Sequence, residues 1–249
     1  MSLGEYAVCV ITKMIIHEDS MVEKLSLSAS RKEHVAAVLE HEKMIYVGRV
    51  KRVDFYKYAV CVVMKMRIHE DCEVGDLMLD ATREERVAAV FEQEKAFCVG
   101  RVKSINLGLY AVSILSKLGI HEDCVVEILS LYARKEVAAV LEQYQTLCVE
   151  RVKNMLLWDY AVCVLIKLRI CEDNIKENLY LVAYGEQFSR ILEEGDSSIE
   201  LGRIRRCGFY VTEEIRRKLR YILVDGEGKE VLEEGSDEEE TAASYRETS

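Results

Sequence analysis

Tyr160-Ala-Val-Cys-Val-Leu-Ile-Lys-Leu-Arg-Ile-Cys-Glu-Asp173 is one of four related copies of the same stretch in this chain. The other copies begin at Tyr6, Tyr58 and Tyr110, so the starting tyrosines lie 52, 52 and 50 residues apart. Self-similarity at such a period is typical of repeat proteins, in which each unit buries its apolar face against its neighbours. The sequence therefore predicts a stack of about four units.

Charge is distributed unevenly along the chain. The formal net charge of the 249 residues is −10, but residues 225–249 hold ten acidic and two basic side chains. The residues before them are therefore close to neutral, which gives no support to a uniform attraction to nucleic acid or to an anionic membrane. We predict a helical-repeat domain over residues 1–224 and an acidic disordered tail over residues 225–249.

The nine cysteines follow the repeat rather than a disulfide pattern. Cys9, Cys61 and Cys163 share a repeat position with Ser113. A position that also accepts serine is used for packing, so we predict reduced thiols and a cytoplasmic or nuclear location. No uninterrupted apolar run reaches the ~18 to 20 residues of a membrane-spanning helix.

Each unit divides into three segments. The Tyr-Ala-Val-Cys segment is apolar on nearly all sides and predicts a buried helix, which the polar His-Glu-Asp triplet ends. A second helix is predicted around Val35-Ala-Ala-Val38 and its counterparts at 87–90 and 137–140. The third segment, Tyr46–Lys51 with counterparts at 98–103 and 148–153, is interpreted as a short helix, with a β-strand as the alternative because it alternates and is β-branched. A last helix is predicted over residues 212–223.

The fourth unit, Asp159 to Asn178 followed by Gln187-Phe-Ser-Arg-Ile-Leu-Glu-Glu-Gly195, resembles an armadillo repeat, especially the kind found behind the U-box of plant ubiquitin ligases. The resemblance extends over about residues 5–210 and implies an all-α fold, a right-handed α-solenoid whose third helices line a concave groove. The related HEAT class stays open, because the period is longer than that of armadillo units. No U-box is present, so ligase activity is not implied. The residues of importin-type repeats that bind basic peptides are also missing.

One lysine per unit is the first candidate for partner binding. In helices at their usual separation, the four would form a ladder with ~10 Å steps, suited to an extended acidic protein segment. The alternative is local pairing with nearby acids at a helix C-terminus. These residues are Lys13, Lys65, Lys117 and Lys167.

Two further basic rows are candidates for the same role. They could bind phosphate or an acidic partner, and the alternative is a solvated helix face. The rows are Arg49, Arg101 and Arg151, and Lys51, Lys103 and Lys153, with Arg203 to Arg206 adjoining them.

The sequence offers few motifs that could bind a metal ion or catalyse a reaction. His17, His69 and His121 recur one per unit, too far apart to share one metal ion, so they are interpreted as turn residues and no metal is predicted. There is no glycine-rich phosphate loop and no Gly-x-Ser-x-Gly or His-Glu-x-x-His motif. We therefore expect no catalytic residues and no cofactor.

The sequence favours a non-enzymatic scaffold or adaptor that binds an extended, acidic protein segment on a concave face. One alternative is a nucleic-acid or ribonucleoprotein factor that uses the Arg/Lys rows. The other is a regulatory subunit of a chaperone or ubiquitin-ligase system.

Overall fold

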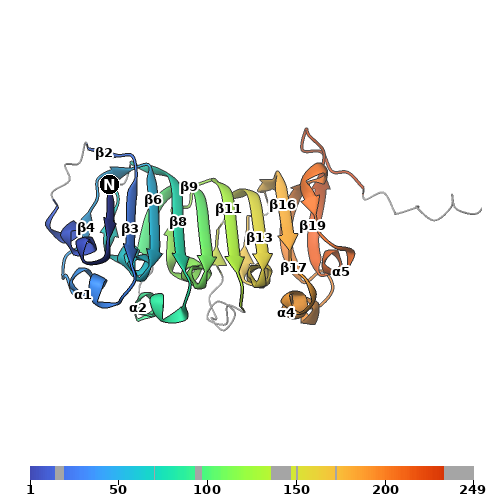
Figure 1. Ribbon diagram of the computed structural model, residues 1–249. Helices are drawn as coiled ribbons and strands as arrows, with labels where there is room; N and C mark the ends of the chain where they lie inside the picture. The colour runs from blue at the N-terminus through green and yellow to red at the C-terminus, as the bar shows by residue number, and fades with distance from the viewer. Residues whose placement is uncertain are drawn as a thin grey trace, which may run out of the picture.

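A long parallel β-sheet runs the length of the molecule (Figure 1). The computed structural model describes residues 1–14, 20–69, 71–92, 97–135, 147–149, 151–171 and 173–232. Within them, each strand of the main sheet pairs in parallel with the next one along the chain, so the strand order in space follows the sequence. The strands are β1 (Ser2–Gly4), β3 (Leu25–Ala29), β6 (Arg52–Lys57), β8 (Glu73–Ala81), β9 (Phe97–Leu109), β11 (Val126–Ala133), β13 (Val152–Asp159), β16 (Asn178–Val182) and β18 (Phe209–Tyr210).

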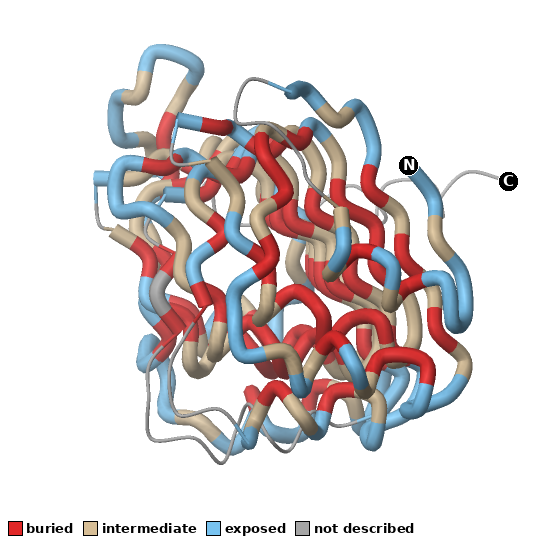
Figure 2. The backbone as a smooth tube through the Cα atoms, turned by 90° about the vertical axis from the view of Figure 1, so that its left-hand side faces the viewer, coloured by how far each residue is buried: buried red, intermediate tan, exposed pale blue. Residues whose placement is uncertain are grey.

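Alternation of apolar residues fixes one face of this sheet as the core. Leu25, Val53, Leu77, Ile105 and their successors pair side by side and are fully buried. In a strand, every second side chain points to the same face, so this register collects the apolar residues into continuous columns. Viewed along the stack, the buried residues line the inside of the turns (Figure 2).

Two kinds of turn alternate behind the sheet. The Tyr-Ala-Val-Cys segments form 3-10 helices, and the intervening turns carry short α-helices or mixed turns; α1 contacts both η1 and η2, and α2 contacts both η2 and η4. The 3-10 helices of the first kind are η1 (Glu5–Lys13), η2 (Tyr58–Lys65), η4 (Tyr110–Lys117) and η5 (Tyr160–Ile166). The other turns contain α1 (Glu33–Leu39), η3 (Glu84–Arg86) with α2 (Ala88–Phe91), η6 (Gly185–Phe188) with α4 (Ser189–Glu193), η7 (Arg206–Gly208) and α5 (Glu213–Arg216).

The spacing of parallel strands explains why the sequence repeats over 52 residues. Leu25, Val53 and Leu77 are neighbours in the sheet, at sequence separations of 28 and 24 residues, so one sequence period makes two turns. Successive turns advance by about 4.8 Å, the distance between paired strands. The axes of packed α-helices lie about 8–10 Å apart, so an α-helix in every turn would not fit a spacing of one strand per turn. Alternating 3-10 and α-helical turns satisfies both spacings.

A second set of short parallel strands lines the side of the stack away from the main sheet. These strands pair between neighbouring turns and continue the stacking where each turn returns to the sheet. The pairs are β2 (Met21–Val22) with β5 (Arg49–Val50), β4 (Ile45–Tyr46) with β7 (Met66–Arg67), β10 (Leu118–Ile120) with β9, β12 (Leu147–Cys148) with β14 (Leu168–Arg169), and β15 (Ile175–Lys176) with β17 (Ile199–Arg205) and β19 (Leu219–Val224).

The predicted all-α armadillo or HEAT solenoid is wrong, because the chain is dominated by this parallel sheet. The segments taken as the helices of each unit are a strand-flanked 3-10 helix and a short α-helix; the counterpart at 137–140 lies outside the described residues. For the third segment the strand alternative is correct, since residues 45–50 form β4 and β5 and residues 98–103 belong to β9. The predicted helix over 212–223 is only α5, followed by β19.

The junction between a main strand and a 3-10 helix requires an uncommon backbone. Lys57, Leu109 and Asp159 each precede such a helix with φ of 59°, 57° and 54°. Residues with a Cβ rarely adopt positive φ, and holding them there costs of order 1–3 kcal/mol. The sharp exit from the sheet is thus a property of the repeat.

The chain beyond the predicted repeat domain begins with a fold-back rather than an open end. The backbone N–H of Val231 donates to the carbonyl of Leu223 (2.9 Å), and Val224 forms an antiparallel bridge with Glu230. Residues 233–249 of the predicted acidic tail lie outside the described residues. In the part that the structure describes, no helix has the length and apolar character needed to cross a membrane.

Candidate functional site

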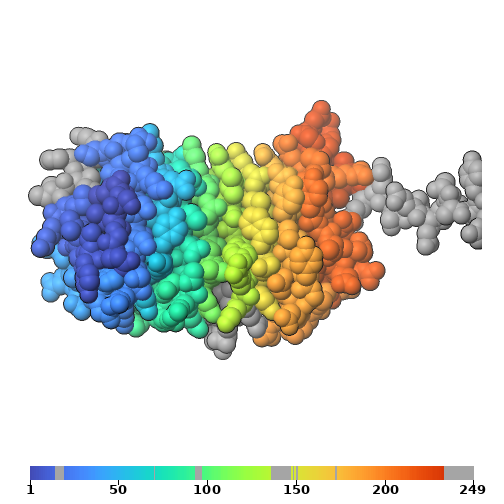
Figure 3. Space-filling view, in the orientation of Figure 1, coloured from blue at the N-terminus to red at the C-terminus, as the bar shows by residue number. Residues whose placement is uncertain are grey.

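The main sheet turns one face to the core and the other, here called the outer face, away from it. In the space-filling view, bands of colour cross this face in chain order (Figure 3). The strand register arranges its side chains in three rows, and all of them except Asp54 are at least partly exposed. The rows are Arg52, Asp76, Ser104, Ile128, Asn154 and Asn178; Ser26, Asp54, Met78, Asn106, Ser130, Leu156, Tyr180 and Tyr210; and Ser28, Tyr56, Asp80, Gly108, Tyr132, Trp158 and Val182.

Over strands β3 to β8 the outer face is a network of paired charges, which we call the charged half. Asp54, with no exposed side-chain surface, accepts from Lys24 Nζ at 2.7 Å and from Arg52 Nε at 2.9 Å. Arg52 also reaches Asp76 at 3.3 Å. Hydrogen bonding to Asp54 raises the pKa of Arg52. These groups satisfy one another, so this half offers little unpaired charge to a ligand.

The network extends to the middle of the sheet through β9. Asn106 donates through Nδ2 to Asp76 and to Ser104 Oγ, the latter at 3.0 Å. A Cβ at Gly108 would collide with the carboxylate of Asp80, so glycine makes room for that side chain. Burial raises the pKa of Asp80.

From β11 onward the same three rows carry large apolar and aromatic side chains, which we call the aromatic half. Ile128 is 41% exposed and Tyr210 is 50% exposed. The rings of Tyr180 and Tyr210 stack at 4.5 Å with an angle of 13°. The set is Ile128, Tyr132, Leu156, Trp158, Tyr180, Val182 and Tyr210, and it includes the only tryptophan of the chain.

Polar groups border the aromatic half on two sides. On one side Asn178 donates to Asn154 Oδ1 (2.6 Å), and Asn154 donates to the carbonyl of Glu127 (2.9 Å). On the other side Arg134 lies over the ring of Tyr132, 5.8 Å from its centroid, and hydrogen bonding to the phenol raises the pKa of Arg134. Apolar contact area with a polar border is the usual anatomy of a protein-binding surface.

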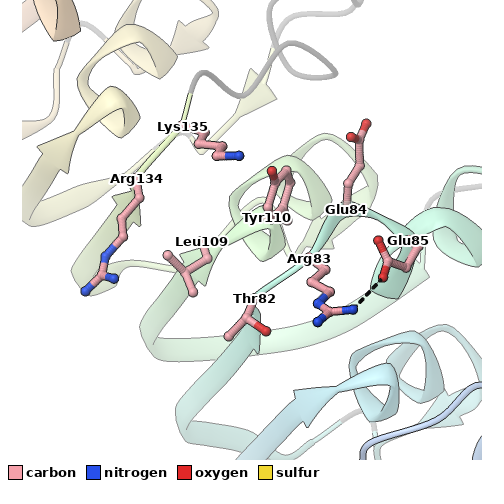
Figure 4. A pocket seen from close by; sticks show the side chains of 8 residues that line it. All are labelled: Thr82, Arg83, Glu84, Glu85, Leu109, Tyr110, Arg134 and Lys135. Atoms are coloured by element: carbon pink, nitrogen blue, oxygen red, sulfur yellow. Dashed lines mark ion pairs between the residues drawn. The ribbon is translucent and has the colours of Figure 1, made fainter.

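An open pocket of about 440 Å³ lies where β8, β9 and β11 end, next to Arg134 (Figure 4). Arg83 pairs with Glu85 at 3.6 Å, so part of its charge is already compensated. The pocket carries three cationic and two acidic side chains, and this mixture selects no single sign of ligand. Its lining is Thr82, Arg83, Glu84, Glu85, Leu109, Tyr110, Arg134 and Lys135.

The four predicted lysines do not reach the outer face. Lys13, Lys65 and Lys117 are the last residues of η1, η2 and η4, and Lys167 follows η5. Successive copies lie two turns apart, which is again about 10 Å. Lys65 donates to the backbone carbonyl of His41 at 3.0 Å.

The two basic rows lie at the starts of the main strands and pair with acids of adjacent turns. Lys51 meets Glu23 at 2.7 Å, and Lys103 meets Glu73 at 2.6 Å. Arg49 lies 4.0 Å from Asp71, while Arg101 and Arg151 are exposed and Lys153 is half-buried. The adjoining Arg203 donates to the carbonyl of Gly228. Partly paired, solvent-exposed cations of this kind agree with the alternative of a solvated surface.

Histidine and cysteine have structural contacts here. His69 and His121 each accept the backbone N–H two residues on, at 3.1 and 3.2 Å, as a turn residue does; His17 lies outside the described residues. Cys61 Sγ donates to the carbonyl of Arg86, and burial raises its pKa to about 11. Among the described residues, no three His, Cys, Asp or Glu side chains come together as a metal site would require.

The aromatic half was missed at the level of sequence. Its signal is a strand-like apolar segment in which both faces carry large side chains, as in Leu129-Ser-Leu-Tyr-Ala133 and Met155-Leu-Leu-Trp-Asp159. Comparisons with family models, curated proteins and solved structures found no match to this chain.

Proposed function

We propose that this protein is a non-enzymatic interaction module that binds a protein partner on the aromatic half of its outer face. The supporting observation is the contrast along one sheet: charges pair with one another over β3 to β8, and aromatic and aliphatic side chains that are exposed or half-buried replace them from β11 to β18. Contiguous exposed apolar area commonly marks a binding surface, and Trp, Tyr and Arg supply most binding hot spots.

The chemistry of the surface indicates the kind of partner. Strands β11, β13 and β16 are paired on both sides and β18 is the edge strand of the sheet. A segment that contacts all four therefore lies across the strands and meets their side chains. Tyr132, Trp158 and Val182 form one crossing row, and Leu156, Tyr180 and Tyr210 form the next. A segment with two or three large apolar side chains fits these rows, and an acidic residue at its end meets the exposed guanidinium of Arg134.

The other candidate functions gain no comparable support. For a nucleic-acid factor, part of the basic charge is already compensated, because Lys218 pairs with Asp196 at 2.9 Å and Arg220 pairs with Glu200 at 2.6 Å in the C-terminal turns. No described feature favours a chaperone or ligase subunit in particular.

The test is capture of a partner from lysate with the full chain and two variants. Tyr210→Ser and Trp158→Ser together remove the centre of the aromatic half, and Tyr56→Ser removes a matched tyrosine from the charged half. We expect a partner that the wild type and Tyr56→Ser both retain and that the double variant loses, with circular dichroism confirming equal folding. Equal retention by all three proteins would contradict the proposal.

Binding can then be measured without a label. Trp158 is the only tryptophan and lies in the proposed site, so its emission reports directly on contact with the purified partner. We expect a blue shift that saturates on titration, and a loss of at least about tenfold in affinity for Tyr210→Ser alone, the cost of roughly 1.4 kcal/mol.

A further inference from the structure

The N-terminal end of the stack exposes residues that every later unit buries. Val62, Ile114 and Val164 have exposed fractions of 0%, 0% and 1%, whereas the equivalent Val10 is 50% exposed. Tyr6 is 66% exposed, and Ala7 is exposed while its counterparts are buried. The first unit thus carries the residues of an internal interface in place of the polar outer face that a capping repeat needs.

The later units show what covers the equivalent residues. In the interior, η2 is contacted by both α1 and α2, and η4 is contacted by α2, whereas η1 is contacted by α1 alone of these helices. No described element takes this place before η1. Strand β1, beside it, pairs only with β3, and a Cβ added at Gly4 would meet nothing within 4 Å. An unpaired, uncharged strand edge therefore adjoins an exposed apolar helix face.

The opposite end of the stack is partly covered. The outer side of β19 is occupied by the fold-back, in which Val231 bonds to Leu223 and Asp225 N–H donates to Lys229 O at 2.9 Å. Exposed Arg220 and its partner Glu200 add charge to that end. The fold-back covers β19 but leaves β18 as the edge strand of the main sheet, so the two ends of the stack differ. A contact between two N-terminal ends is isologous and closes with two copies.

The charges on η1 suit such a two-fold contact. Glu5 begins this helix and Lys13 ends it. An antiparallel pair of η1 helices sets each Lys13 beside the other copy's Glu5. Ser30 donates to Glu5 from N–H (3.1 Å) and Oγ (2.7 Å), which lowers the pKa of this carboxyl. His34 Nδ1 of the same chain contacts the same carboxylate oxygen, so Lys13 of a second copy would join an existing cluster.

We infer that the N-terminal end, made of β1 with Tyr6, Ala7 and Val10 of η1, is a docking surface for a second copy of this chain. The two β1 strands meet antiparallel across the axis and join the main sheets, while the apolar faces of the η1 helices pack on each other. The aromatic halves then lie at the two far ends of one continuous sheet, so the dimer presents two copies of its outer-face site.

Sedimentation velocity of the full chain tests this at micromolar concentration. We expect a species of twice the 28.6 kDa chain mass. Val10→Glu should weaken the association at least about 100-fold, because it sets two carboxylates against each other in an apolar contact. Val125→Glu, at a valine that is 39% exposed elsewhere on the surface, is the matched control and should leave the dimer intact.

The opposing results are equally clear. A wild-type protein that remains monomeric at 100 μM would overturn the inference and would mean that another chain or a preceding segment covers this end. A dimer that Val10→Glu leaves unchanged would also overturn it. Because Val10 is half exposed, Val10→Glu should fold, and equal circular dichroism of the two glutamate variants verifies this. Dimerisation does not depend on the aromatic half, so it is tested independently of the proposed function.

Discussion

The charged half and the aromatic half of the outer face share one backbone and differ in chemistry. Both stand on the same buried columns, with Val53 and Leu77 under the first and Leu129 and Met155 under the second. Over the charged half the exposed side chains bind each other, and Asp54 alone has two cationic partners. Over the aromatic half they stack or remain open. Stability is therefore concentrated in the side chains of the first, and binding capacity in those of the second.

Buried charges sharpen the same contrast. Asp54 in the charged half is buried with two cations, whereas Lys176, behind the aromatic half, is buried with a hydrogen bond to the carbonyl of Leu201. Lys176 takes the place that Val126 and Val152 occupy in earlier turns, and burial lowers its pKa from 10.5 to about 8. A buried charge that lacks an opposite charge weakens the fold.

The largest predicted effect is a gain of stability from Lys176→Met. Below pH 8 the folded state keeps Lys176 charged at a cost of about 3 kcal/mol, because each unit by which its pKa is lowered corresponds to about 1.36 kcal/mol. Between pH 8 and 10.5 the unfolded chain binds more protons than the folded one, so wild-type stability rises with pH in that window. Urea unfolding at pH 7 and pH 10 should show a large gain at pH 7 that shrinks at pH 10. A Lys229→Met control should show neither.

Asp54→Ala should destabilise the protein by about 2 kcal/mol. Breaking a buried ion pair costs more than this, but Lys24 and Arg52 are 50% and 43% exposed, so water takes over part of the lost contact. The free energy of unfolding in urea measures the loss. Tyr210→Ser, in the aromatic half, should change it by less than about 1 kcal/mol. A larger loss for Tyr210→Ser than for Asp54→Ala would reverse the assignment of the two halves.

The smallest effect should be the same in both halves. Lys57→Gly and Asp159→Gly each relieve a positive φ at a strand exit, and the gain is partly offset by the greater freedom of glycine in the unfolded chain. We expect each to stabilise by up to about 1 kcal/mol, measured by thermal unfolding. Opposite signs would show that the two junctions are not equivalent.

The repeat could be predicted from the sequence, but the secondary structure of the repeat unit could not. The period of 52 is visible from the tyrosines alone, yet it spans two turns, and this doubled period invited comparison with paired helices. Tyr-Ala-Val-Cys is apolar on all sides whether it forms an α-helix or a 3-10 helix, so periodicity could not separate them. The strand alternative for residues 46–51 was set aside because the neighbouring segments are helical; they are α1 and η2, and short strands join them.

The candidate site was out of reach for a related reason. Trp158, Tyr180 and Tyr210 are 22 and 30 residues apart in sequence, and only the register of three parallel strands brings them together. The predicted cations were visible in the sequence because each recurs in the repeat. Trp158 shares its repeat position with Tyr56, but Tyr132 stands where earlier units hold Ser28 and Asp80, and Tyr180 where they hold Ser26, Met78 and Ser130. This departure from the repeat is what distinguishes the aromatic half.

The most direct test of the proposed binding surface is site-specific photo-crosslinking in lysate, with a benzophenone amino acid in place of Tyr210 in one protein and Tyr56 in another. The two positions share one face of one sheet, so they sample the same solvent and the same bystander proteins. We predict a discrete adduct of one partner from position 210 and only background from position 56. Equal adduct patterns from both positions, or none from position 210, would contradict the assignment of binding to the aromatic half.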